Sequence, residues 1–362
     1  MELMNKLDFE RCMDRVEAWW HREVIDRPPV WIAVKKGRQP RTAPAHHASP
    51  RDRWLDVEYN IERAEAHIEA GVFLAENFPR YMPFVGPSVC ACAYGAELMG
   101  FDEETSWAEP VATNIRQVPG LSPNLDNPYW NVIRRMTELS LERGAGKWIT
   151  CVTDLHTNGD LLASLRGTQN LCLDYAEDFE GVRLACEHVR PVTMLFFDDL
   201  WKRRIAPAGS PACCTWANCL SRGTMYYVSC DFICMIGPEM FRKTLLPLLA
   251  WECGQLGHSI FHLDGPGALK HLDDLLAIPE LDAIQWVYGA GAGPAARWID
   301  VYQRIQAAGK GIEVMAADLN DARAVMEHLR PEGVWLWPGG TYGRDEAESF
   351  LKETARWAAG LR

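Results

Sequence analysis

Short runs of consecutive apolar residues alternate with amphipathic segments along much of the chain. Apolar runs of about five residues are typical of strands buried on both faces, as in parallel sheets. Eight such runs are present, at residues 30–34, 82–85, 148–152, 224–228, 259–263, 283–287, 312–316 and 333–337. The last four alternate with helical patterns at 269–276, 295–308 and 321–329. The pattern therefore predicts an α/β chain that folds as a (β/α)8 barrel.

In the first third of the chain, the pattern of apolar residues and prolines predicts two helices and a long irregular segment. Apolar residues recur at helical spacing in 1–26, where Asp8 is placed to cap the helix, and again in 51–77. Residues 78–128 contain seven prolines and are too long for a simple connector. We therefore interpret the whole chain as one barrel domain, in which 38–128 forms a helical, loop-rich cap.

The chain length of 362 residues suits a single barrel with such additions. A doubly wound open sheet is the competing fold, and it predicts a glycine-rich loop directly after the first strand. The residues at that place, 35–38, read Lys-Lys-Gly-Arg and match such a loop poorly. The barrel is therefore the favoured fold.

The formal net charge is −12, from 37 lysine and arginine against 49 aspartate and glutamate residues. Proteins that bind nucleic acids usually show a basic face, and no dense basic run occurs here. The N-terminal residues lack the apolar region of a signal peptide, and no apolar run reaches the roughly 18 residues of a transmembrane helix. We therefore expect a cytoplasmic protein that binds neither nucleic acid nor membranes. Its 12 cysteines are expected to be free thiols, without a Cys-x-x-Cys zinc ribbon.

Polar residues follow three of the predicted strands, at the end where a parallel barrel places its chemistry. Asp154, Asp231 and the pair formed by His262 and Asp264 each follow or end a different strand, and these four are the predicted catalytic residues. Because residues two apart on a strand point to the same side, His262 and Asp264 are candidate metal ligands or an acid/base pair. The alternative is a histidine that is simply hydrogen-bonded by a carboxylate. Asp231 is a candidate third ligand or general base, with a helix cap as its alternative.

Further residues near the strand ends are candidates for substrate binding. His156 lies close to Asp154 in sequence, whereas Asp160 is interpreted as a helix cap. Glu313 points either into the barrel, as a candidate acid or ligand, or outward. Cys230 is interpreted as a buried thiol. Aromatic faces can stack on rings or hold quaternary ammonium groups, and the predicted contacts of this kind are Trp216, Trp286, Tyr288 and Trp337.

The motifs with the most specific spacing lie between residues 224 and 290. They are Ser-Cys-Asp-Phe at 229–232, Ile-Gly-Pro-Glu-Met-Phe at 236–241 and Ser-Ile-Phe-His-Leu-Asp-Gly at 259–265, supported by Leu-Arg-Gly at 165–167 and Leu-Asp-Ala-Ile-Gln-Trp at 281–286. Together they resemble the uroporphyrinogen decarboxylase superfamily over most of residues 80–355, and most closely its branch labelled trimethylamine-corrinoid-protein-like. The resemblance implies a (β/α)8 barrel, zinc-dependent methyl transfer with a corrinoid protein as partner, and a homodimer.

Two departures from the superfamily bear on the chemistry that the resemblance implies. The decarboxylase binds propionate groups with an N-terminal Arg-Gln-Ala-Gly-Arg-type motif. The corresponding residues here, 34–38, read Val-Lys-Lys-Gly-Arg and match that motif only in part. The zinc methyltransferases bind metal through His-x-Cys and a second cysteine on the last strand. Here the first motif is His262-x-Asp264, and the last predicted strand has no cysteine. Such an oxygen-rich site suits an alcohol, phenol ether, amine or water better than a thiol.

The sequence thus predicts metal-assisted methyl transfer: demethylation of a small methoxy or methylamine substrate with a corrinoid partner. Zinc would be held by His262, Asp264 and Asp231. One alternative is a carbohydrate-active hydrolase or lyase, because Asp154, Asp231 and Asp264 together with several tryptophans would serve oxocarbenium chemistry. The other is a non-catalytic scaffold that binds a ligand without turnover.

Overall fold

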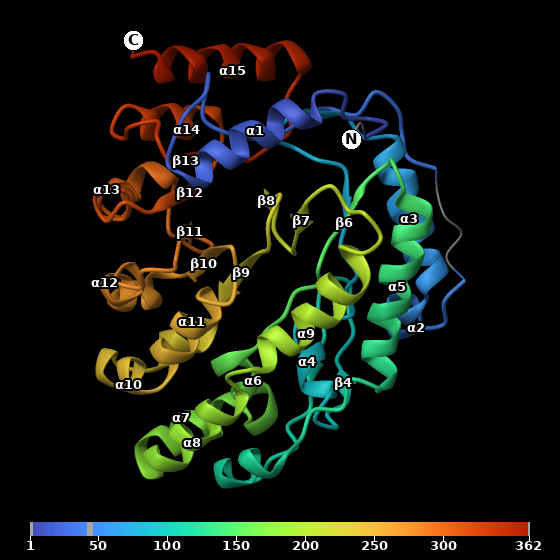
Figure 1. Cartoon of the computed structure of the whole chain (residues 1–362), viewed down its shortest axis with the longest axis vertical. Coiled ribbons are helices and arrows are strands. Elements are labelled where there is room, and N and C mark those ends of the chain that lie inside the picture. The colour runs from blue at the N-terminus through green and yellow to red at the C-terminus, as the bar shows by residue number, and fades with distance from the viewer. Residues whose placement is uncertain (1–2, 42–45, 361–362) are drawn as a thin grey trace.

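The centre of the molecule is a five-stranded parallel sheet. A computed structural model describes residues 3–41 and 46–360 of the chain (Figure 1). The sheet has the strand order β13–β12–β11–β10–β9, with every neighbouring pair parallel. Its strands are β9 (Met225–Ser229), β10 (His258–Asp264), β11 (Ala283–Val287), β12 (Gly311–Ala316) and β13 (Val334–Pro338). The five C-terminal strands predicted from the apolar runs are therefore confirmed.

Helices follow the strands of this sheet in turn and lie along its outer side (Figure 1). They bury apolar side chains such as Val301 and Ile305 against the strands, which is why the intervening segments are amphipathic. These helices are α10 (Pro238–Lys243), α11 (Leu245–Cys253), α12 (Leu272–Leu276), α13 (Ile299–Ala307), α14 (Leu319–Met326) and α15 (Arg344–Ala358). Three 3-10 turns precede or extend them: η3 (Asp231–Met235), η4 (Pro266–His271) and η5 (Ala295–Trp298).

The remaining strands are short and pair two by two. β1 (Trp31–Ala33) and β2 (Phe73–Ala75) are antiparallel, β3 (Arg80–Tyr81) and β6 (Ile149–Thr150) are parallel, and β4 (Leu98–Met99) with β5 (Trp107–Ala108) and β7 (Cys213–Cys214) with β8 (Leu220–Ser221) are antiparallel. The strand predicted at 82–85 is wrong, because pairing stops at Tyr81 and Pro83 has no N–H to donate. Arg80 can lie in a strand because main-chain carbonyls of Thr215 and Trp216 accept its guanidinium hydrogens, at 3.1 and 3.2 Å.

The helices of the first half differ in part from their predictions. The predicted helix 1–26 is α1 (Phe9–Trp20), and Asp8 makes no capping bond because its carboxylate pairs with Lys6 instead, at 2.8 Å. The predicted helix 51–77 is two helices and β2, broken where Asp56 caps the second helix. The helices before β9 are α2 (Pro50–Leu55), α3 (Val57–Glu69), α4 (Val89–Cys92), α5 (Pro128–Gly144), α6 (Asn158–Arg166), α7 (Thr168–Glu177), α8 (Phe179–Val189) and α9 (Val192–Leu200), with η1 (Ile115–Gly120) and the π-helical turn η2 (Trp201–Ile205).

Helix α1 packs against the amino ends of the parallel strands. The indole nitrogen of Trp19 donates to the carbonyl of Gly333, just before β13, and that of Trp20 donates to Leu220, both at 2.9 Å. The Trp20 ring also stacks on His258, the first residue of β10, with centroids 4.4 Å apart. Helix α1 therefore covers the amino ends of β10 and β13.

The proline-rich segment 78–128 packs against three helices, α5, α6 and α8. Main-chain N–H groups of Val111 and Ala112 both donate to the carbonyl of Leu165, at 2.9 Å. Within residues 3–41 and 46–360, no helix has the length and apolar character needed to cross a membrane.

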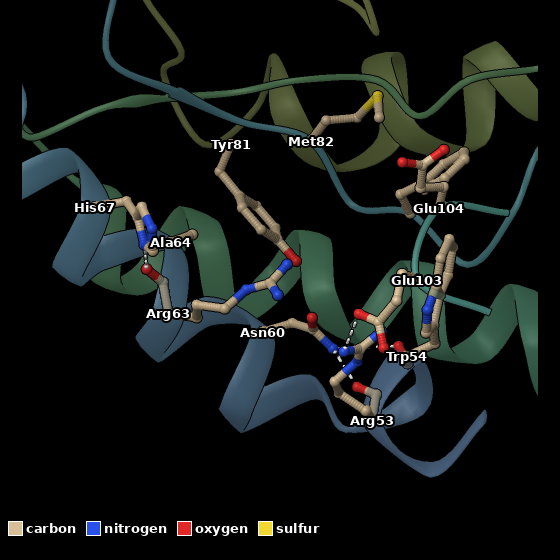
Figure 2. Close-up of a pocket in the computed structure, with 11 residues that line it drawn as sticks. Arg53, Trp54, Asn60, Arg63, Ala64, His67, Tyr81, Met82, Glu103 and Glu104 are labelled. Atoms are coloured by element: carbon tan, nitrogen blue, oxygen red, sulfur yellow. Dashed lines mark hydrogen bonds and ion pairs between the residues drawn. The ribbon is translucent and has the colours of Figure 1, made fainter. Parts of the chain in front are cut away.

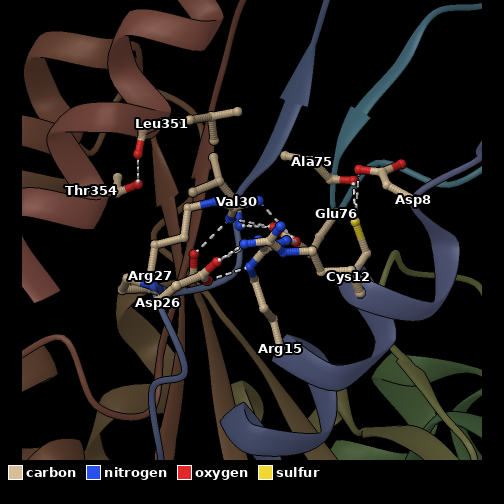
Figure 3. Close-up of polar contacts among 12 residues, drawn as sticks. Asp8, Cys12, Arg15, Asp26, Arg27, Val30, Ala75, Glu76, Leu351 and Thr354 are labelled. Carbon is tan, nitrogen blue, oxygen red and sulfur yellow. Dashed lines mark hydrogen bonds and ion pairs between the residues drawn. The ribbon is translucent and has the colours of Figure 1, made fainter.

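A buried ion cluster fastens α1 to β1 and β2 (Figure 3). The Glu76 carboxylate is fully buried, and Arg27 binds it through two nitrogens at 2.7 and 3.0 Å. Arg15 and the main-chain N–H of Val30 donate to the same carboxylate, at 3.2 and 2.7 Å, while Arg15 also pairs with Asp26. Every oxygen of Glu76 is therefore satisfied, as a buried charge requires.

We expect Glu76→Ala to lower the free energy of unfolding by about 3–5 kcal/mol, because it leaves two buried guanidinium groups without their shared partner. Urea unfolding followed by tryptophan fluorescence measures this change. The matched control is Glu239→Ala, which removes an exposed ion pair with Lys243 and should change the stability little. Equal effects of the two substitutions would contradict the role given to Glu76.

Candidate functional site

The four predicted catalytic residues lie near the carboxyl ends of three strands. Asp154 lies in the loop after β6. Asp231 begins η3 directly after β9, His262 lies within β10 and Asp264 is the last residue of β10. One ligand atom of each of these three side chains lies within 4.8 Å of the others. The structure thus brings together the three residues predicted to hold a metal.

A second set of side chains meets the first at Asp231. His156 and Asp160 each place a ligand atom within 4.8 Å of the other and of an Asp231 oxygen. His156 in turn forms an ion pair with Asp154, at 3.2 Å. All the predicted catalytic residues therefore belong to one continuous group, with Asp231 at its centre.

A row of polar side chains crosses the sheet beneath this group. In the strand register, Ser229 of β9, His262 of β10, Gln285 of β11 and Glu313 of β12 lie side by side, so their side chains point to the same face. His262 Nδ1 donates to Gln285 Oε1 at 2.5 Å, and Gln285 Nε2 donates to Glu313 Oε2 at 2.8 Å. The hydroxyl of Tyr227 donates to the other Glu313 oxygen, at 2.5 Å.

This row fixes the orientation of the His262 ring. Since Nδ1 carries the proton that Gln285 accepts, Nε2 keeps its lone pair and is the nitrogen available to a metal or a proton. The Trp216 ring meets His262 edge-on, with centroids 4.9 Å apart, and fills the space on one side of the imidazole. Glu313 is fully buried and lies on the same face of the sheet as His262 and Gln285.

Burial raises the pKa of Glu313 to about 8, against the opposing hydrogen bonds from Tyr227 and Gln285. The carboxyl group is therefore neutral over most of the physiological pH range. Glu313 contributes hydrogen bonds to the row without adding a buried negative charge.

The electrostatics around Asp231 are dominated by carboxylates. Burial, with a smaller contribution from Asp231, raises the pKa of Asp160 to about 6 despite the opposing charge of His156. Burial opposes the positive charge of His156, but Asp154, Asp160 and Asp231 outweigh it and raise the pKa of that imidazole to about 9. Burial and the charge of Asp231 also raise the pKa of Asp264. The group therefore favours bound cations and protons.

The start of α6 holds Asp160 against the end of β9. Asp160 does act as a cap, but of η3 rather than of its own helix: its oxygens accept the main-chain N–H groups of Asp231 and Phe232, at 3.0 and 2.9 Å. Asn158 has a φ of 53°, in the left-handed region, and its amide donates to the Ser229 carbonyl at 2.9 Å. Gly159 comes so close to Cys230 that a Cβ there would lie 2.7 Å from the sulfur.

The aromatic residues predicted to bind substrate separate into three places. Trp216 contacts His262, whereas Tyr288 and Trp337 line a cavity of about 390 Å³ with Trp31 at the carboxyl ends of β11, β12 and β13. Trp286 lies outside both, because its neighbour Gln285 faces inward and its own ring is buried against Trp298, with centroids 5.2 Å apart. Cys230 is a buried thiol, as predicted.

A second cavity, of about 490 Å³, lies between α2, α3 and the chain after β3 (Figure 2). Figure 2 shows Tyr81 pointing toward the Arg63 side chain, with Trp54 and Glu103 at the other end of the cavity. The 78–128 segment therefore borders this cavity, and not the aromatic cavity that contains Trp337.

Comparison with known proteins adds no assignment, since the sequence matches no model of a protein family and no curated protein. The geometry itself extends the predicted site by Gln285, Tyr227 and Ser229. A polar residue inside an apolar run, such as Gln285 in 283–287, is a signal that the sequence contained. The contact of Arg80 with main-chain carbonyls left no comparable signal, because it depends on the distant residues 215 and 216.

We expect the free energy of unfolding to fall as the pH rises from about 5 to about 9, partly through Glu313. Its folded pKa lies above that of an unfolded glutamate, so the native state holds the extra proton and loses this advantage as pH approaches the folded pKa. Glu313→Gln should flatten this slope by an amount on the order of a few kcal/mol across the range. Urea unfolding at several pH values measures it, with the exposed Glu239→Gln as control. A slope unchanged by Glu313→Gln would contradict the neutral state of this carboxyl group.

Proposed function

We propose that this protein is a metal-dependent methyltransferase. It would remove the methyl group of a small methoxy or methylamine compound and pass it to the corrinoid of a partner protein. The observation that carries the proposal is the convergence of Asp231, His262 and Asp264 at the carboxyl ends of two neighbouring parallel strands. The resemblance of 224–290 to corrinoid-linked methyltransferases supplies the reaction and the partner.

We further infer that the parallel sheet continues as a (β/α)8 barrel. Val30 and Leu336 form a parallel bridge that joins the β1 region to β13. On the other side, the Val152 N–H donates to the Cys214 carbonyl at 2.8 Å, and the Cys213 thiol donates to the Met225 carbonyl at 3.4 Å. These bonds support a ring that runs from β13 through β1 and from β9 through β7 to β6 and β3.

The donor set fits zinc. One imidazole and two carboxylates match the nitrogen and oxygen ligands of catalytic zinc sites, which keep a position open for substrate. Gln285 would serve as the outer partner that orients His262, since metal-binding histidines usually donate their second N–H. Zinc bound by these residues would polarise the oxygen or nitrogen that carries the methyl group.

The chain's own residues would place the substrate. The cavity lined by Trp31, Tyr288 and Trp337 begins beside β10, because its lining residue Val287 pairs with Asp264 in the strand register. Aromatic faces bind flat rings and alkylammonium groups, so this cavity suits the apolar or cationic part of the substrate. The methyl-bearing atom would then lie toward Asp264.

A second candidate function is glycoside hydrolysis or lysis. Asp160 and Asp231 each place one carboxyl oxygen within 4.8 Å of the other, and Asp160, whose pKa burial raises to about 6, could act as the acid. Retaining glycosidases hold their two carboxyl groups about 5–5.5 Å apart. Turnover of glycosides by chelator-treated protein, abolished by Asp160→Asn, would favour this function over methyl transfer.

We expect the purified protein to bind zinc again when it has been stripped with a chelator, the chelator has been removed and zinc has been added back. His262→Ala and Asp264→Ala should each reduce bound zinc by about one ion per chain, because each removes a first ligand. Elemental analysis measures the content, and the exposed His328→Ala is the matched control. Zinc-loaded protein should also methylate a reduced corrinoid protein from a panel of methoxyaromatics and methylamines, followed by visible absorption. Absence of zinc binding in the unaltered chain would overturn the proposal.

Gln285→Ala should weaken zinc affinity by about 10–100-fold, because His262 loses the acceptor that fixes its ring. A competition titration with a zinc-binding dye gives the affinity. Trp286→Phe, at the next position but facing the helices, should leave it unchanged. An unaltered affinity in Gln285→Ala would show that the row across the sheet does not orient a ligand.

A further inference from the structure

Two metal-ligand sets share the carboxylate of Asp231. One contains His262 and Asp264, and the other contains His156 and Asp160, each with ligand atoms within 4.8 Å of one another. Within residues 3–41 and 46–360, the Asp231 carboxylate has no hydrogen-bond or ion-pair partner. Both of its oxygens are therefore free for ligands.

The negative charge of this region is not balanced by the protein. Asp154, Asp160, Asp231 and Asp264 gather here, yet across the described part of the chain no lysine or arginine forms an ion pair with any of them. Even with His156 protonated, the group keeps an excess of negative charge. Asp231 is exposed, whereas the other three are at least partly buried. Carboxylates gathered in this number are stabilised by bound cations or by protons.

A buried hydroxyl without a partner faces the same space. Ser229 is 4% exposed, and its Oγ has no hydrogen-bond partner among the described residues. It pairs with His262 in the strand register and so points to the inward face, one layer below Asp231. One Asp154 oxygen is likewise buried without a partner. Unsatisfied oxygens of this kind mark a place that a ligand or its bound water completes.

We propose that the protein binds a pair of divalent transition-metal ions bridged by the two oxygens of Asp231. One ion is held by His262 and Asp264, and the other by His156 and Asp160. This inference rests on the proposed function for the first ion and adds the second. The mixed nitrogen and oxygen donors suit zinc, manganese, iron or cobalt rather than calcium.

The capping bonds of Asp160 are compatible with this role. A carboxylate has about four lone-pair positions, and the N–H groups of Asp231 and Phe232 occupy only one on each Asp160 oxygen. These bonds would orient the carboxylate as an outer partner orients a ligand. The ion pair with Asp154 would do the same for the His156 ring.

The second ion also narrows the substrate class. Paired ions about 3.5–4 Å apart bind two neighbouring donor atoms or stabilise one atom that becomes negative. The site would therefore favour a methoxy compound with a second oxygen next to the methyl-bearing one, such as an ortho-methoxyphenol, over a simple amine. Both oxygens of such a ring would face Asp231, with the ring in the cavity of Tyr288 and Trp337.

The test counts ions bound by the full-length chain. Protein stripped with a chelator is equilibrated with excess Mn²⁺, the unbound ion is removed, and bound manganese is measured by elemental analysis and electron paramagnetic resonance. We expect about two ions per chain and the spectrum of an exchange-coupled pair. His156→Ala and His262→Ala should each retain about one ion with an uncoupled spectrum, while His328→Ala keeps the pair.

Each outcome separates this inference from the proposed function. One ion that is lost in His262→Ala but kept in His156→Ala would overturn the pair and leave the proposed function intact. One ion lost only in His156→Ala, or no ion at all, would overturn both. Asp160→Asn, with circular dichroism as the check of folding, repeats the test without touching an imidazole; an undiminished pair in this variant would remove Asp160 from the site.

Discussion

The hydrogen bonds that run sideways across the sheet, from His262 through Gln285 to Glu313, are the constraint on which the site depends. They form only because β10, β11 and β12 are parallel and in a register that sets these three residues side by side. A shift of any one strand by one residue would turn its polar side chain toward the helices and bury it unpaired. The same register brings Asp231 and Asp264 to neighbouring strand ends. The register of these strands therefore determines both the pairing in the sheet and the positions of the site residues.

The amino and carboxyl ends of the sheet differ in how their side chains are packed and how their charges are paired. At the amino ends, Trp19 and Trp20 pack against the strands, and charges such as Glu76 are fully paired. At the carboxyl ends, carboxylates gather with His156 but without lysine or arginine partners among the described residues, and Asn158 adopts a left-handed backbone conformation. Uncompensated charge and backbone strain each cost stability. The well-packed end offsets that cost, which lets the other end keep polar groups without partners.

The C-terminal half of this fold could be predicted from sequence, because its strands are continuous apolar runs separated by amphipathic helices. In the N-terminal half, the apolar runs at 30–34 and 148–152 do contain β1 and β6. Strand β3 could not be predicted, since it contains Arg80, whose charge is satisfied only by carbonyls far along the chain. In the candidate site, the rule that strand ends meet at one edge predicted that Asp231, His262 and Asp264 lie close together, as they do. Sequence could not show that Asp160 caps η3, nor that Trp286 faces away, because both depend on how α6 and β11 are rotated in the fold.

The packing of α1 has a consequence for the order in which the protein forms as it is synthesised. Trp19 bonds to Gly333, 314 residues later in the chain, and Trp20 bonds to Leu220, 200 residues later. A ribosome adds about 5–20 residues per second, so α1 emerges many seconds before its partners exist. Until β13 has been synthesised, the apolar face of α1 stays exposed or is bound by a chaperone. Helix α1 is therefore synthesised long before it can reach its native contacts.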